Sequence, residues 1–141
     1  DRSEDEDPWA HTVSGALVLS CTRQDPKEKG LLWATEIARL QLRPGLVVVL
    51  SGCNTGCGLL TGDGVGGLAR AFLTSGASTV VASVSPVFDA QTQRLMTEFY
   101  RNLKANPTGG AAHALHTSMN AMLPHCNHPS EWAPFVVLGG L

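Results

Sequence analysis

The 141-residue chain has few cysteines and no long apolar run. Its four cysteines, Cys21, Cys53, Cys57 and Cys126, are too few and too widely spaced for a disulfide framework. We therefore expect free thiols and a cytoplasmic location, because the cytoplasm keeps thiols reduced. No apolar stretch approaches the roughly 20 residues of a membrane-spanning helix, and no signal-peptide pattern is present, so we expect no membrane partner.

The chain also carries little charge. Charged residues make up 16% of it and the formal net charge is −2, which predicts no general attraction to nucleic acid or to an anionic membrane. The hydrophobic content of 43% is typical of a globular α/β protein. The acidic run from Asp1 to Asp7 predicts a linker over residues 1–13, followed by one domain over residues 14–141. Because no initiator methionine is present, we expect a piece of a longer protein.

Apolar runs and helical repeats alternate along the chain. Strands are predicted at residues 14–21, 46–51, 78–84 and 135–138, and helices at 31–42, at 65–73, from 89 to about 103 and at 111–123. The apolar positions predicted to face a core are Leu32, Ile37, Leu40, Val65, Leu68, Ala69, Phe72, Leu73, Leu95, Met96, Phe99, Tyr100, Leu103, Leu115, Met119 and Met122. Such alternation predicts a mainly parallel sheet with helices on both faces.

The strand at Leu46–Leu50 leads directly into a turn that carries Cys53. Open α/β sheets place their sites at the carboxyl ends of their strands, so this thiol is a candidate nucleophile. The glycines around it, Gly52, Gly56 and Gly58, would leave backbone amides accessible. A free cysteine is also commonly a small buried hydrophobic residue, so both interpretations of Cys53 stay open.

Two patterns near Cys53 have simpler explanations. Cys57 follows it with three residues between, but structural zinc needs four ligands at recognisable spacing, so we interpret Cys57 as a loop thiol. Residues 62–67 contain G-x-G-x-x-G, yet about ten residues separate this motif from the strand that it should follow directly in a dinucleotide site. We therefore expect no nucleotide and no other cofactor.

Four histidines and a cysteine near the C-terminal end are residue types that can bind a metal ion. They are His113, His116, His125, Cys126 and His128. The last three lie in a polar loop with no C-x-x-C partner, so we predict solvated histidines and no metal.

Asp89 and His11 are weaker candidates for the site. Asp89 is predicted to cap a helix, and the same carboxylate could also line a substrate pocket. His11 is the one histidine that precedes Cys53, which makes it a candidate base. Because it lies next to the acidic run, we interpret it as a surface residue.

Taken in order, several segments resemble a CHAT domain, a family similar to caspases and separases that usually follows tetratricopeptide repeats. They are residues 14–19 (Ser14-Gly-Ala-Leu-Val-Leu19), 31–42, 46–56 around Cys53, 62–73, 76–87, 99–103 (Phe99-Tyr-Arg-Asn-Leu103) and 132–136 (Trp132-Ala-Pro-Phe-Val136). The resemblance implies a caspase-like three-layer α/β/α fold, of which this chain would be the C-terminal part with the first strands missing.

The same resemblance implies a cysteine–histidine dyad that cleaves peptide bonds. Cys53 matches the cysteine of the family motif Ser-Ala-Cys-Glu-Thr-Gly, which makes the backbone amides of Gly52 and Cys53 candidates for the oxyanion site. Ser51 and Asp89 match positions near the substrate pocket. The family's histidine lies in a His-Gly pair that would fall upstream of Asp1, and His11 has no following glycine.

Three departures from the family pattern support a second hypothesis. Asn54 replaces the usual acid, Gly52 replaces the usual alanine, and Ser85 stands where tryptophan is frequent. The leading prediction is a cysteine endopeptidase domain of a larger tetratricopeptide-repeat protein, acting on a protein or peptide substrate. The alternative is an inactive CHAT domain that serves as a protein-interaction scaffold.

Overall fold

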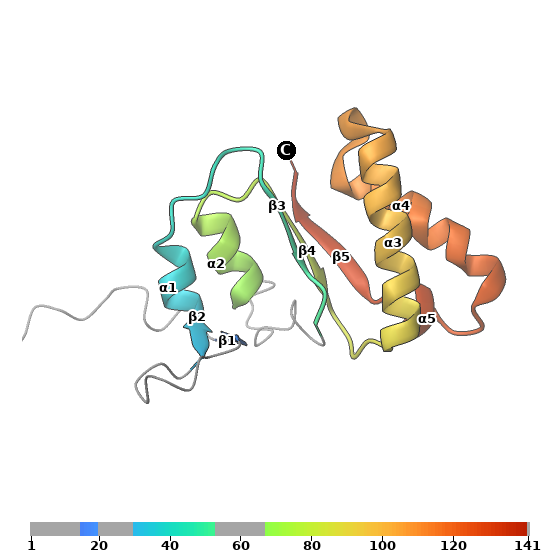
Figure 1. Cartoon of the computed structure of the whole chain (residues 1–141), viewed down its shortest axis with the longest axis horizontal. Helices are drawn as coiled ribbons and strands as arrows, with labels where there is room; N and C mark the ends of the chain where they lie inside the picture. Colours follow the sequence, from blue (N-terminus) through green and yellow to red (C-terminus); the bar gives the residue numbers. More distant parts are fainter. Residues whose placement is uncertain (1–14, 20–29, 53–66, 141) are drawn as a thin grey trace, which may run out of the picture.

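The computed structural model describes residues 15–19, 30–52 and 67–140, which form three layers (Figure 1). In these residues the strands are β1 (Ala16–Val18), β2 (Leu31–Trp33), β3 (Val47–Leu50), β4 (Thr79–Ser83) and β5 (Phe135–Gly139). The helices are α1 (Ala34–Ala38), α2 (Leu68–Thr74), α3 (Asp89–Ala105), α4 (Gly110–Met122) and α5 (Pro129–Trp132), with 3-10 turns η1 (Pro107–Gly109) and η2 (Leu123–His125). Helix α2 covers one face of the sheet, with α1 packed against α2, and α3 and α4 cover the other face, which confirms the expected α/β/α architecture.

The central sheet has the order β3-β4-β5 in the described part of the chain. Strands β3 and β4 run parallel, with Leu50 beside Ala82, and β5 runs antiparallel to β4, with Phe135 beside Ser83. The sheet is therefore mixed, and its strand β4 lies between two partners. All five residues of β4 are buried, as expected for an apolar run that helices cover on both faces.

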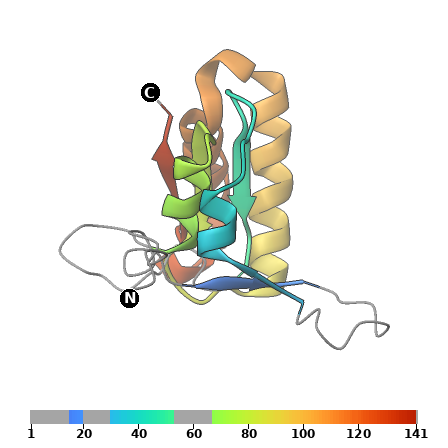
Figure 2. The same cartoon turned by 90° about the vertical axis from the view of Figure 1, so that its left-hand side faces the viewer.

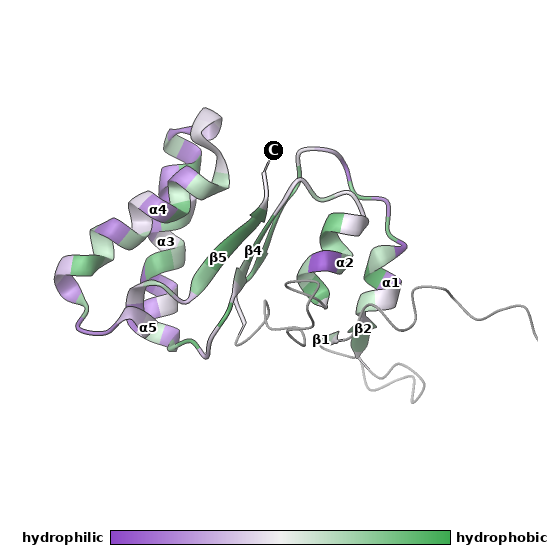
Figure 3. Cartoon of the chain, turned by 180° about the vertical axis from the view of Figure 1, so that it is seen from behind, coloured by the Kyte–Doolittle hydropathy of each residue, from purple (hydrophilic) through white to green (hydrophobic). Residues whose placement is uncertain are grey.

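Side chains of β4 alternate between two apolar clusters. Val81 points to the cluster that contains Leu95 and Phe99 of α3, whereas Val80 and Ala82 point to the cluster that contains Ala69 of α2. This alternation is the period of two that a strand imposes on its side chains. Figure 3 shows the result, with hydrophobic colour along β4 and β5 and mixed colour on the helices.

The first two strands form a separate antiparallel ribbon, and here the prediction for residues 31–42 was wrong at its start. Leu31–Trp33 pair with Ala16–Val18 instead of beginning a helix, and α1 covers only Ala34–Ala38. The amide of Trp33 donates a hydrogen bond of 2.8 Å to a carboxylate oxygen of Glu36, which fixes the start of the helix. Figure 2 shows that β1 crosses the direction of β3.

Most core positions predicted on the helices are confirmed. Seven of them are buried: Ile37, Ala69, Leu95, Met96, Phe99, Leu115 and Met122. Six more are partly buried and pack against the apolar clusters: Leu32, Leu68, Phe72, Leu73, Leu103 and Met119. Leu40 and Tyr100 are exposed to 43% and 53%, because α1 ends before Leu40 and Tyr100 lies at the margin of the apolar face of α3. Val65 lies outside the described residues. None of the helices in the described ranges combines the length and apolar character needed to cross a membrane.

Candidate functional site

The carboxyl ends of β3 and β4 meet at one edge of the sheet because the two strands are parallel. Strand β3 ends at Leu50, and Ser51 and Gly52 lead from it toward Cys53. Both Ser51 and Gly52 are exposed, so the chain reaches the surface at this edge. Cys53 and His11 lie outside the described residues, and their roles stay predictions.

A side-chain hydrogen bond joins the two strands at this edge. The hydroxyl of Ser83 donates to the carbonyl of Gly52 at 2.5 Å, and Ser83 is fully buried at the end of β4. Because Gly52 directly precedes Cys53, this bond fixes the position of the backbone from which the candidate nucleophile follows. No local sequence pattern indicates this contact, because a serine at the end of a strand has many possible partners.

The start of β5 completes the edge. The amide of Val84 donates a hydrogen bond of 2.8 Å to the carbonyl of Pro134, just before β5 begins at Phe135. The edge is thus built from the ends of β3 and β4 and the start of β5, three segments far apart in the sequence. Hydrogen bonds between these segments hold the edge in a defined geometry, which a functional site requires.

Asp89 lies at the start of α3, where it differs from the prediction by one position. It is the first helical residue, and Phe88 occupies the capping position without a side-chain hydrogen bond to the helix. The prediction of Asp89 as the cap is therefore wrong, although a carboxylate in the first turn still interacts favourably with the helix dipole. Asp89 is exposed, which leaves it accessible to a ligand.

The histidines of the C-terminal half are exposed, which confirms the prediction that they are solvated. His113 and His116 lie on α4, and His125 lies in η2. His128 caps α5, where its Nδ1 accepts a hydrogen bond from the amide of Ser130 at 3.2 Å. Within the described ranges, no group of three or more histidine, cysteine or acidic residues is arranged to hold a metal ion.

The family assignment rests on nearly the whole chain. The model of the CHAT domain matches residues 9–140. The chain belongs to the CHAT domain family. The matched range includes the strands β3, β4 and β5, the edge that they form, and the predicted nucleophile.

Two curated relatives of this CHAT domain are tetratricopeptide repeat proteins. The chain is 36% identical over 129 residues to human (Homo sapiens) tetratricopeptide repeat protein 28, an alignment that covers 89% of this chain and 5% of that protein. It is 36% identical over 126 residues to the mouse (Mus musculus) protein of the same name, covering 86% of this chain and 5% of the relative. The chain therefore spans about one twentieth of the length of the curated relatives that it matches.

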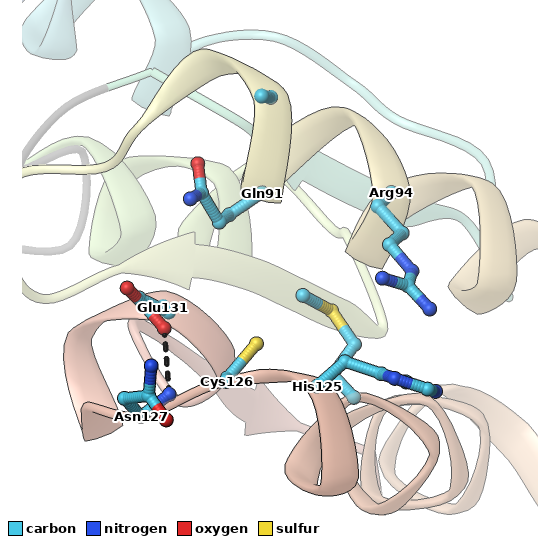
Figure 4. A pocket seen from close by; sticks show the side chains of 8 residues that line it. Gln91, Arg94, His125, Cys126, Asn127 and Glu131 are labelled. Atoms are coloured by element: carbon cyan, nitrogen blue, oxygen red, sulfur yellow. Dashed lines mark hydrogen bonds between the residues drawn. The ribbon is translucent and has the colours of Figure 1, made fainter.

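The CHAT domain also has a pocket that sequence reasoning missed. It has a volume of about 280 Å³ and lies between the first turns of α3 and the segment from η2 to α5 (Figure 4). Its lining residues are Ala90, Gln91, Arg94, Met122, His125, Cys126, Asn127 and Glu131. No local pattern could have predicted it, because the return of α4 brings these two segments together.

The other predicted features near Cys53 fall largely outside the described residues. These are Cys57, Asn54 and residues 62–66 of the glycine-rich motif. Gly67, the last glycine of the motif, is described and precedes α2 with a φ of +83°. This left-handed conformation is readily adopted by glycine, which agrees with the structural interpretation of the motif as a turn before a helix.

Proposed function

We propose that this CHAT domain is a cysteine endopeptidase domain within a tetratricopeptide-repeat protein, with Cys53 as its nucleophile. The observation that supports the proposal most directly is the position of Gly52, whose carbonyl is held by Ser83 at the carboxyl edge of parallel strands. The chain leaves this edge at the residue before the family cysteine. A cytoplasmic location is part of the proposal, because the nucleophile must stay reduced.

The proposed reaction is nucleophilic catalysis by a thiolate. The sulfur of Cys53 attacks the carbonyl carbon of a peptide bond, and a histidine accepts the thiol proton and then delivers it to the leaving amine. The family motif puts this histidine in a His-Gly pair upstream of residue 1. Water then hydrolyses the acyl-enzyme and restores the thiol.

The negative oxygen that forms during the attack requires hydrogen-bond donors. The backbone amide of Cys53 is the proposed donor from this chain, and one such donor is worth roughly 3 kcal/mol of transition-state stabilisation. A fixed Gly52 would contribute here, because the peptide unit between residues 52 and 53 carries both the carbonyl that Ser83 binds and the amide of Cys53. Asp89 and Ser51, both exposed, are the proposed contacts for substrate.

A second candidate function is a catalytically inactive scaffold that binds other proteins. The departures Gly52, Asn54 and Ser85 from the family pattern support it. The same architecture would then present a binding surface without chemistry. The two functions differ in whether the thiol of Cys53 reacts with a carbonyl.

Replacing the nucleophile tests the proposal. In the full-length protein, Cys53→Ala should lower peptide cleavage by at least about a thousandfold, because it removes the atom that attacks the peptide carbonyl. The matched control is Cys57→Ala, a change of the same size four residues along the chain, which should retain cleavage. Peptides carrying an electrophile in place of the scissile bond should label Cys53 in the unmodified protein.

Two results would contradict the peptidase. Cleavage that survives in Cys53→Ala would show that another group performs the chemistry. Failure of every electrophilic peptide to label Cys53, in a protein whose thermal melting shows that it is folded, would favour the scaffold.

A further inference from the structure

The pocket between α3 and α5 is lined by several polar side chains. Gln91 and Arg94 lie one turn apart on α3 and project toward the segment that carries Cys126, Asn127 and Glu131 (Figure 4). The buried side chain of Met122 contributes an apolar floor. The exposed Arg94 and Asn127 form part of the lining, so the pocket is open to solvent.

The pocket contains two opposite charges, Arg94 and Glu131, and they do not form an ion pair with each other. Within the residues that the structure describes, the side chains of Arg94 and His125 have no hydrogen-bond or ion-pair partner, whereas Arg101 on the same helix pairs with Glu98. The carboxylate of Glu131 has a backbone partner, because its Oε2 accepts a hydrogen bond of 2.9 Å from the amide of Asn127. The guanidinium is thus free to bind an anion, and the second oxygen of Glu131 is free to accept a hydrogen bond.

We propose that this pocket binds a carboxylate of a peptide, with Arg94 as the residue that binds the carboxylate. A guanidinium offers two parallel N–H donors that match the two oxygens of a carboxylate. The amide side chains of Gln91 and Asn127 can each donate and accept, so they suit the peptide groups next to that carboxylate. This binding does not depend on whether Cys53 is a nucleophile.

The charges and the size of the pocket limit what it can hold. Glu131 places a negative charge in the same cavity as Arg94, which lowers the attraction of the cavity for any anion. The volume of about 280 Å³ is just below the usual range for pockets that enclose drug-sized ligands, which fits the end or the side chain of a peptide. The carboxylate can come from a peptide C-terminus or from an aspartate or glutamate side chain.

Three fluorescent peptides separate these sources. The first is Ala-Ala-Leu with a free C-terminal carboxylate, the second is the same peptide with a C-terminal amide, and the third is acetyl-Ala-Glu-Ala with a C-terminal amide. Binding is measured by fluorescence anisotropy in the full-length protein carrying Cys53→Ala, so that cleavage cannot interfere. Either the peptide with the free C-terminus or the peptide with the glutamate side chain should bind at least tenfold more tightly than the amidated Ala-Ala-Leu. The peptide that does so shows whether the pocket binds a C-terminal carboxylate or a side-chain carboxylate.

Variants of the pocket then test the assignment of Arg94. Arg94→Gln should raise the Kd of the bound peptide at least tenfold, since it removes a charge-assisted hydrogen-bonding partner. The matched control Arg101→Gln makes the same change on the same helix outside the pocket and should alter the Kd by less than twofold. Glu131→Gln keeps an acceptor for the amide of Asn127 but removes the negative charge, so it should lower the Kd two- to threefold.

Cys126 reports whether binding occurs in this pocket. Its partly buried thiol lines the cavity, so a bound peptide should slow its alkylation, measured by mass spectrometry of the peptide that contains it. Protection should disappear in Arg94→Gln and persist in Arg101→Gln. The proposal is overturned if the amidated peptide binds as tightly as the acids, if inorganic phosphate competes better than acetate, or if both arginine variants have the same effect.

Discussion

The two helical layers of the molecule are built from side chains of different size. Between the sheet and α3 and α4, the core consists of large residues such as Leu95, Phe99, Leu115 and Met122. On the other face, the buried residues of α1 and α2 are mostly alanines, with Ile37 as the one large side chain that is fully buried there. One layer is stabilised by the area that it buries, the other by the close approach of backbones.

The turn after α2 shows how close this approach is. Gly76 has a φ of +105°, and a Cβ at this position would lie 3.0 Å from the carbonyl oxygen of Leu42. Next to it, the amide of Leu42 donates a hydrogen bond of 2.8 Å to the carbonyl of Ser75. Small residues therefore allow the chain around α1 and α2 to pack tightly, and we expect the two layers to respond in opposite ways to changes in side-chain size.

The largest effect is expected from truncation in the α3–α4 layer. Phe99→Ala should lower the free energy of unfolding by about 4 kcal/mol, because it removes a fully buried aromatic ring and leaves a cavity. The measurement is chemical denaturation followed by circular dichroism. The neighbour Tyr100, 53% exposed and in edge contact with Phe99 at a centroid distance of 5.3 Å, is the control. Tyr100→Ala should cost about 1 kcal/mol, and equal losses would refute a core centred on Phe99.

Enlargement should damage the α1–α2 layer instead. Ala71 is fully buried where α2 packs against α1, so Ala71→Leu should lower the free energy of unfolding by about 2 kcal/mol through overpacking. Leucine and alanine are both good helix formers, so helix propensity contributes little. Ala112→Leu makes the same change at an exposed position of α4 and should be nearly neutral in the same denaturation experiment. A neutral Ala71→Leu would show that this layer has unfilled space.

The smallest effect on stability is expected between the layers, at the sheet edge. Ser83→Ala should cost about 1 kcal/mol, because the carbonyl of Gly52 loses a hydrogen bond from a buried hydroxyl. It should also speed alkylation of Cys53 severalfold relative to Cys126, since the end of β3 is held less firmly. Ser75→Ala removes a similar bond, of 2.8 Å to the carbonyl of Phe72, and should leave alkylation of Cys53 unchanged. If both variants change alkylation equally, the bond has no specific role at the edge.

Elements with a strong local pattern could be predicted from the sequence. The apolar runs at 46–51 and 78–84 contain β3 and β4, and the apolar repeat through Leu95 and Phe99 predicted α3. The strand β2 could not be predicted in this way, because its three residues become a strand only by pairing with β1. The pairing joins segments that residues 19–30 separate along the chain, so the pattern within either segment does not reveal it.

The candidate site likewise combines features that a local sequence pattern predicts with features that depend on contacts between distant segments. Cys53 could be named as a candidate because an apolar run followed by a glycine-rich stretch is a local signal, and its role stays a prediction. The support of Gly52 by Ser83 and the pocket of Arg94 and Glu131 depend on contacts between distant segments. The one-residue error at Asp89 has a local cause, because Phe88 already has the extended backbone of a capping residue.

The antiparallel direction of β5 has a practical consequence for experiments on this domain. Phe135 starts beside Ser83 at the candidate edge, and Gly139 finishes beside Thr79 at the opposite end of the sheet. The amide of Gly140 donates to the carbonyl of Ser78 at that opposite end. A fluorophore or surface tether attached there would therefore leave the exposed Ser51 and Gly52 accessible.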